Sequence, residues 1–110
     1  MIKKPLKSKK KYCYISGKIS GLPMEEVKTK FAEAEKSVIA IGYIPINPTK
    51  NGVESDNWGD HMVEDVKSLN KCEAVYFLSD WEESAGAAVE HIFAVNTAKK
   101  MIYQPKNQIS

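Results

Sequence analysis

Residues 74–94 read AVYFLSDWEESAGAAVEHIFA, and this stretch decides the fold. It opens with a continuous apolar run over 74–79, which is typical of a strand covered on both faces of a sheet. A polar loop follows, and residues 84–98 then show a helical pattern in which Ala88, Ile92 and Val95 are expected to face inward. A buried strand that leads through a short loop into a helix is the repeating unit of a parallel α/β sheet.

The rest of the chain repeats this unit. Apolar runs predict strands, and apolar residues at three- and four-residue steps predict helices. The strands are expected at 12–16, 43–47, 74–79 and 100–103, and the helices at 23–41 (inward: Val27, Phe31, Ala34, Val38, Ile41), 58–70 (inward: Met62, Val66, Leu69) and 84–98. The order predicts a flavodoxin- or Rossmann-like three-layer α/β sandwich with a parallel sheet of four, or five, strands. Pro45 places its strand at an edge, because proline cannot donate to a strand ladder.

The charge is unevenly distributed along the chain. Six of the 16 lysines lie in residues 1–11, and the net charge of the whole chain is +2. We expect a disordered lysine-rich tail at 1–11 and a single domain at 12–104. The tail is either a solvated terminus or a weak contact for nucleic acid or an anionic surface, and no aromatic residue within it offers a stacking platform for bases. The sequence contains no arginine, so no bidentate guanidinium can bind a phosphate.

Two cysteines and two histidines are spaced too far apart to form a metal-binding motif. Cys13 and Cys72 are expected to be reduced and buried, and His61 and His91 to be non-catalytic. We therefore expect neither a metal nor a cofactor. The chain has no apolar run long enough for a membrane span or a signal peptide, so we expect a cytoplasmic protein.

Two loops leave strand ends and enter helices, and both are rich in small residues. The first, GKISGLP at 17–23, follows Ser16 and is either a plain turn or a cradle for an anion. In the second, Ser84 is expected to cap the helix, and Gly86 leaves space beside its first turn. Glu90 stands in the second turn, where it is either a solvated side chain or aimed at the space between the loops. If the two strands are neighbours, both loops line one pocket.

Asp65 is the second carboxylate of interest, although a surface position would also suit it. It lies in the predicted helix 58–70, next to the inward-facing Val66. A pair of carboxylates at the anomeric carbon of a sugar is the usual equipment for cleaving a glycosidic bond, because one attacks or stabilises while the other handles the proton. Asp65 and Glu90 are candidates for such a pair.

Several motifs resemble one known family. The motifs are YISGKISG at 14–21, Asn47 with Pro48, the pattern of Asp65, Leu69 and Cys72, and DWEESAGAAVE at 80–90. Together they resemble a small family of unknown function within the nucleoside 2-deoxyribosyltransferase-like superfamily. The resemblance covers residues 12–103. Among characterised relatives, the chain is most similar to the 2'-deoxynucleoside 5'-monophosphate N-glycosidases, which split a deoxynucleotide into base and deoxyribose 5-phosphate.

The resemblance implies a role for each matching position. It implies that Glu90 is the nucleophile at C1' and that Asp65, with Tyr14, positions the sugar or manages the proton. It implies that Ser84 holds the 5'-phosphate, where the plain transferases carry an aspartate for an uncharged 5'-hydroxyl. The remaining residues expected to bind substrate are Ser16, Gly17, Lys18, Ile19, Trp81 and Gly86.

The chain departs from this pattern at several places. The glycosidases carry an arginine in the first loop, where this chain has Ser20, so Lys18 is the only substitute for that charge. Ala88 replaces a glycine, and the partner-subunit serine of the relatives has no evident counterpart. Trp81 is expected either to stack on a base at the pocket rim or to pack within the fold.

The sequence thus supports two functional hypotheses. The first is cleavage of an N-glycosidic bond, or transfer of a base, on a nucleoside 5'-monophosphate or related nucleotide. The alternative is a non-catalytic module of the same fold that binds or senses a nucleotide. Under either hypothesis we expect a homodimer or larger homo-oligomer, because a small domain buries little surface on its own.

Overall fold

Four parallel strands form a single sheet at the centre of the protein. The computed structural model describes residues 10–106 and places β1 (Tyr12–Ser16), β2 (Ile44–Ile46), β3 (Ala74–Phe77) and β4 (Lys100–Tyr103) in the order β2-β1-β3-β4. All three pairings are parallel. The predicted parallel sheet is confirmed, and the sheet within these residues has four strands. Pro45 lies in β2, which is an edge strand as expected, because β2 pairs only with β1.

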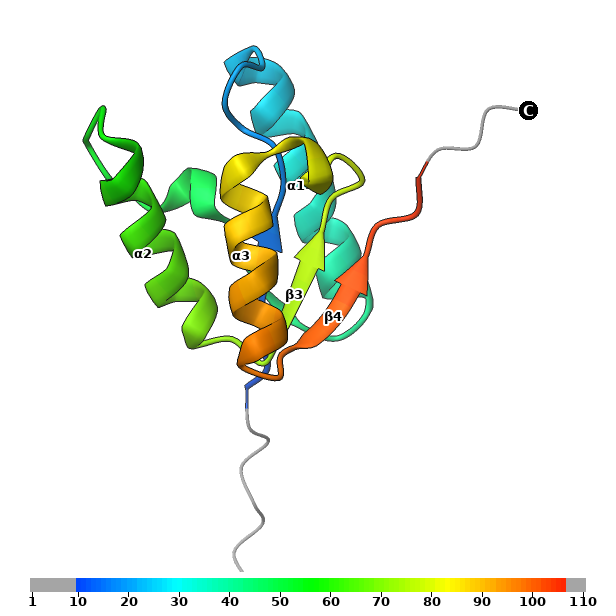
Figure 1. Cartoon of the computed structure of the whole chain (residues 1–110). Helices are drawn as coiled ribbons and strands as arrows, with labels where there is room; N and C mark the ends of the chain where they lie inside the picture. Colours follow the sequence, from blue (N-terminus) through cyan, green and yellow to red (C-terminus); the bar gives the residue numbers. More distant parts are fainter. Residues whose placement is uncertain (1–9, 107–110) are drawn as a thin grey trace, which may run out of the picture.

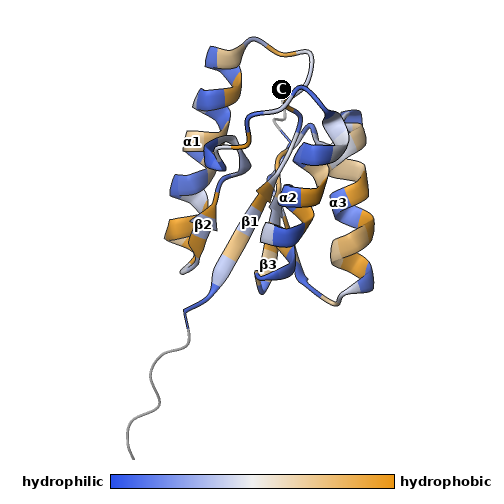
Figure 2. Cartoon of the chain, turned by 90° about the vertical axis from the view of Figure 1, so that its left-hand side faces the viewer, coloured by the Kyte–Doolittle hydropathy of each residue, from blue (hydrophilic) through white to orange (hydrophobic). Residues whose placement is uncertain are grey.

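Three α-helices cover the two faces of this sheet. Helix α1 (Met24–Ala40) lies on one face, and α2 (Trp58–Asn70) and α3 (Ala85–Asn96) lie together on the other (Figures 1 and 2). Two short 3-10 helices, η1 (Pro48–Lys50) and η2 (Trp81–Glu83), interrupt the loops. The layers follow from the right-handed rule for crossovers, since the chain leaves β1 toward one edge and β3 toward the other. The predicted three-layer α/β sandwich is therefore confirmed.

Each face of the sheet has its own hydrophobic core. Alternate residues of β1 and β3 point to opposite faces, so Cys13 and Ile15 meet α1 whereas Tyr14 meets α2 and α3. On the α1 side the buried helix residues are Val27, Phe31, Ala34 and Val38, as the periodicity predicted. Ile41, also expected there, follows the last residue of α1 and is 50% exposed.

The predicted inner face of α3 was wrong. The buried residues are Ala87, Glu90 and Ala94, whereas Ile92 and Val95 are 62% and 55% exposed. This helix is apolar on almost every side, so periodicity alone does not determine which face meets the sheet. Its orientation instead places small alanines against the strands and turns Glu90 inward.

Three further expectations concern the N-terminal tail, the cysteines and membrane-spanning helices. Most of the lysine-rich tail expected at 1–11 lies outside the described residues 10–106, which include only its Lys10 and Lys11, both exposed. Cys13 and Cys72 are free and buried, as expected. No helix within residues 10–106 has the length and apolar character needed to cross a membrane.

Gly17 is fixed by close packing at the end of β1. A Cβ atom at this position would lie 2.5–2.9 Å from three side-chain atoms of Leu78, one of which is its Cβ. Because Leu78 is itself buried next to β3, it has little room to move. The glycine therefore lets the first loop pass directly over the end of β3.

We expect Gly17→Ala to lower the free energy of unfolding by about 1–3 kcal/mol, because the added methyl group overpacks the contact with Leu78. Urea denaturation measures this change. Ser20→Ala is the control, since Ser20 is an exposed residue of the same loop and should change stability by less than about 0.5 kcal/mol. Equal stabilities of the two variants would contradict the packing argument.

Candidate active site

A cavity of about 760 Å³ opens where the carboxyl ends of β1 and β3 meet. These neighbouring strands form the point at which the connections diverge, and ligands of open α/β sheets bind there. The cavity is lined by the loops that follow both strands, by residues 48–49 and 51–56, and by the N-terminal parts of all three helices. The expectation that the two small-residue loops border one pocket is thus confirmed.

Glu90 extends from α3 toward the end of β1 and is only 5% exposed. The hydroxyl of Tyr14 donates a hydrogen bond of 2.8 Å to Oε2, and the hydroxyl of Ser16 donates one of 2.7 Å to Oε1. Tyr14 and Ser16 are two residues apart in a strand, so both side chains point to the face that α3 covers. Each carboxylate oxygen of this buried glutamate therefore has its own donor.

The same surroundings change the acidity of this group. Burial raises the pKa of Glu90 from 4.5 to about 7, although the hydrogen bonds from Ser16 and Tyr14 lower it and the charge of Asp65 raises it. Burial, and then the charge of Glu90, raise the pKa of Tyr14 well above 10. Tyr14 therefore stays neutral and keeps the proton that it donates. Glu90 therefore has a pKa in the range that suits a group that takes up or releases a proton near neutral pH.

Asp65 lines the same cavity from α2. Burial raises its pKa from 3.8 to about 6, while a hydrogen bond of 3.1 Å from the Asn51 side-chain amide lowers it. His61 Nε2 lies 2.6 Å from the carbonyl oxygen of Ser55 and so connects the preceding loop to α2. The cavity thus brings together two carboxyl groups, Asp65 and Glu90, whose pKa values are both raised by burial.

The first turn of α3 offers backbone donors to the cavity. Ser84 caps the helix as predicted, because its Oγ accepts a hydrogen bond of 3.1 Å from the amide of Ala87. Ala85 and Gly86 also line the cavity, and neither of their amides has an acceptor within residues 10–106. Unpaired amides at the start of a helix favour an anion.

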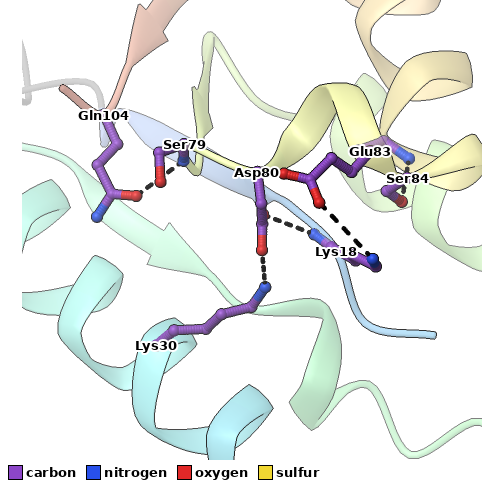
Figure 3. A network of polar contacts seen from close by, with 8 residues as sticks. Lys18, Lys30, Ser79, Asp80, Glu83, Ser84 and Gln104 are labelled. Carbon is purple, nitrogen blue, oxygen red and sulfur yellow. Dashed lines mark hydrogen bonds and ion pairs between the residues drawn. The ribbon is translucent and has the colours of Figure 1, made fainter. Parts of the chain in front are cut away.

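The first loop is held in place by the second. Figure 3 shows Asp80 between Lys18, whose amide donates a hydrogen bond of 3.1 Å to Oδ1, and Lys30 of α1, whose ammonium contacts Oδ2. The backbone of Lys18 is therefore fixed, while its side chain reaches along the cavity. Gly17, Lys18 and Ile19 all line the cavity, as the sequence led us to expect of substrate-binding residues.

Ser16 and Trp81 differ from the expectation that they contact substrate. Ser16 is 1% exposed and is occupied by Glu90. Trp81 does not line the cavity. Its ring stacks on His91 with the ring centroids 4.1 Å apart and packs on Phe77 at 5.4 Å. Of the two alternatives expected for Trp81, its surroundings therefore agree with packing within the fold.

The aromatic residue that sequence reasoning missed is Trp58. It lines the cavity at the start of α2 and is 53% exposed, which is unusual for so large an apolar side chain. A Cβ atom on Gly86 would lie 3.9 Å from its indole nitrogen, so the ring lies beside the first turn of α3. The sequence does contain a signal for this position, because Trp58 follows the loop that leaves the second strand. In a parallel sheet, that loop lies at the same end of the sheet as the loops after the first and third strands.

The charge of the cavity is mostly negative. Its lining includes five carboxyl groups, and Lys18 is the only lysine among the described residues that line it. The carboxyl groups belong to Glu54, Asp56, Asp65, Glu83 and Glu90. Within residues 10–106, no three His, Cys, Asp or Glu side chains lie close enough together to hold a metal ion.

Residues 11–103 match the family described as a domain of unknown function, DUF4406. The chain belongs to this family. The predicted membership of a small family of unknown function is thereby confirmed. A comparison of this DUF4406 protein with curated proteins finds no significant match.

Among solved structures, the DUF4406 domain is similar to a 2-desoxiribosyltransferase from Leishmania mexicana. The TM-score is 0.60 at 19% sequence identity, and the match covers 84% of this chain and 63% of that chain. This chain therefore spans less than two thirds of the length of that structure. At such low identity the match shows the fold alone, and the expected deoxyribosyltransferase-like fold is confirmed. The closer similarity to N-glycosidases stays a prediction.

The raised pKa of Glu90 implies that this residue destabilises the folded protein above neutral pH. The folded state binds a proton between pH 4.5 and about 7 that the unfolded state has released, so stability falls as pH rises through this window. The difference amounts to about 3 kcal/mol. We expect Glu90→Gln to lose this pH dependence and to be more stable than the wild type at pH 8.

Urea denaturation at pH 5 and pH 8 provides the measurement. Glu33→Gln, on the exposed side of α1, should follow the wild type at both values. If Glu90→Gln shows the same pH dependence as the wild type, Glu90 is not the buried acid that the geometry indicates.

Proposed function

We propose that the protein cleaves an N-glycosidic bond, or transfers the base, of a nucleoside 5'-monophosphate or related nucleotide, with Glu90 as the nucleophile. One observation carries the proposal. A buried glutamate, held by two hydroxyl groups, lies at an open cavity at the carboxyl edge of a parallel sheet. A fold with no use for this carboxylate would replace it with an apolar residue, because burying it is unfavourable.

The chemistry follows from the two carboxyl groups. An oxygen of ionised Glu90 attacks C1' of the sugar, the C1'–N bond breaks, and its electron pair leaves with the base. A proton from water that Asp65 orients neutralises the departing base. Water then attacks C1' of the glycosyl ester and releases the sugar and Glu90, whereas attack by a second base completes a transfer.

Two sides of the cavity suit the two ends of a nucleotide. The ammonium of Lys18, the hydroxyl of Ser84 and the free amides of Ala85 and Gly86 are donors for a phosphate. Trp58 and Met24 are 53% and 58% exposed and line the same cavity, so they offer apolar surface to a planar base. In this proposal Trp58 takes the contact with the base that was expected of Trp81.

A second candidate is a module that binds a nucleotide without cleaving it. Two observations favour it: the chain contains no arginine, and five carboxyl groups line the cavity with one lysine. A dianionic phosphate in such surroundings is held less firmly than in a site with a guanidinium. The two candidates share the binding site and differ in whether Glu90 reacts.

We expect the purified protein to release free base from at least one of the eight common nucleoside and deoxynucleoside 5'-monophosphates. Glu90→Ala should lower this rate about 1,000-fold or more, because it removes the nucleophile. Chromatography of the base and of the sugar phosphate measures the reaction. Glu33→Ala, at an exposed residue of α1, is the control and should keep full activity. Binding without release, unaffected by Glu90→Ala, would leave only the binding module.

We expect Tyr14→Phe to move the acidic limb of the rate profile to higher pH. The rate depends on ionised Glu90, whose pKa of about 7 is lowered by the hydrogen bond from Tyr14. Removing that bond should raise the limb by about one pH unit. Tyr76→Phe, on the other face of the sheet, should leave the profile unchanged. A lower rate with an unmoved limb would show that Tyr14 does not set the acidity of Glu90.

A further inference from the structure

Lys18 is the positive side chain of the cavity, and its position is defined by the second loop. Its amide is bound to Asp80, and its side chain is 29% exposed along the cavity wall. Because Lys18 is the only lysine among the described lining residues, any preference of the site for a charged ligand depends on where its ammonium points.

The ammonium points toward Glu83. Glu83 belongs to η2 in the second loop, lines the same cavity, and places Oε1 3.8 Å from the Nζ atom of Lys18 (Figure 3). This distance is too long for a direct hydrogen bond, and the carboxylate side chain is 69% exposed. Within residues 10–106, the side chain of Glu83 has no other polar contact. The ion pair is therefore weak and easily separated.

We propose that Glu83 determines how strongly the site prefers a 5'-phosphate over a 5'-hydroxyl group, by competing with the phosphate for the ammonium of Lys18. The inference rests on the proposed function and names a specificity-determining residue within it. A phosphate that binds Lys18 must either displace the carboxylate of Glu83 or share the ammonium with it, although the two groups have the same sign of charge. A ligand with a free 5'-hydroxyl makes no such demand, so Glu83 disfavours only the phosphorylated ligand.

The size of the effect follows from the exposure of the pair. Exposed ion pairs contribute little, and removing one such competitor corresponds to about 1.4- to 5-fold in affinity. We therefore expect Glu83→Gln to tighten the binding of a nucleoside 5'-monophosphate by about this factor. The affinity for the parent nucleoside should stay the same.

The neighbouring residue supplies a matched control. Glu82 is 59% exposed at its side chain, pairs with Lys106 at 3.1 Å and does not line the cavity. Glu82→Gln therefore makes the same change of net charge one residue away, without touching Lys18. A general effect of charge would appear in both variants, whereas the competition appears only in Glu83→Gln.

The experiment measures dissociation constants by calorimetry in a Glu90→Gln background, so that the ligand is not consumed. The probes are the four deoxynucleoside 5'-monophosphates and their parent deoxynucleosides. We expect Glu83→Gln, but not Glu82→Gln, to tighten the monophosphates alone. Lys18→Gln should weaken the binding of the monophosphates. It should also abolish the effect of Glu83→Gln, because the ammonium for which Glu83 and the phosphate compete is then absent.

Three results would overturn the inference: equal effects of Glu83→Gln and Glu82→Gln, an equal effect on nucleosides, or an effect that survives Lys18→Gln. Failure of the proposed function is a separate outcome. A wild-type protein that releases no base, while Glu83→Gln selectively tightens the monophosphates, loses the enzymatic proposal and keeps this one. If the protein releases base while Glu83→Gln and Glu82→Gln have equal effects on binding, the enzymatic proposal is kept and the inference about Glu83 is lost. If none of the probes binds, both proposals fail.

Discussion

The parallel pairing of β1 with β3 is the constraint on which the rest of the molecule depends. It places the two central strands side by side although α1, β2 and α2 separate them in the sequence. Since the chain leaves them toward opposite edges, their following loops meet at one end of the sheet and no helix covers the gap between them. The same pairing brings the side chains of β1 under α3. The cavity and the buried glutamate are thus two results of one strand order.

The contact between β1 and Glu90 reverses the usual relation between burial and stability. Most buried side chains of this domain are apolar and favour the folded state. Glu90 occupies a central position at which an apolar residue would stabilise the domain, and its hydroxyl partners satisfy the carboxylate without restoring the hydration it loses. Under the proposed function, the domain gives up this stability for a reactive carboxylate, as active sites often do.

The sequence was most informative where the pattern is local. The bounds of β1, α2 and β4 agree with prediction, because each has clear β-forming or helical composition between turn residues. The orientation of α3 could not be predicted, since its residues are apolar on nearly all sides and only the packing against β1 turns Glu90 inward. The two tryptophans show the same limit. Local sequence places each of them near a strand end, and only the three-dimensional contacts separate the packed Trp81 from the exposed Trp58.

Asp80 has a consequence for how proteins of this family can diverge. Its carboxylate is bound both to the backbone of the first loop and to a side chain of α1 (Figure 3), while its own backbone belongs to the second loop. An insertion or deletion in either loop would move one end of this connection and leave the other in place. The two loops therefore cannot change length independently without losing the anchor. The segment at 51–57 also borders the pocket but makes no contact with Asp80, so a change in its length would leave this connection in place.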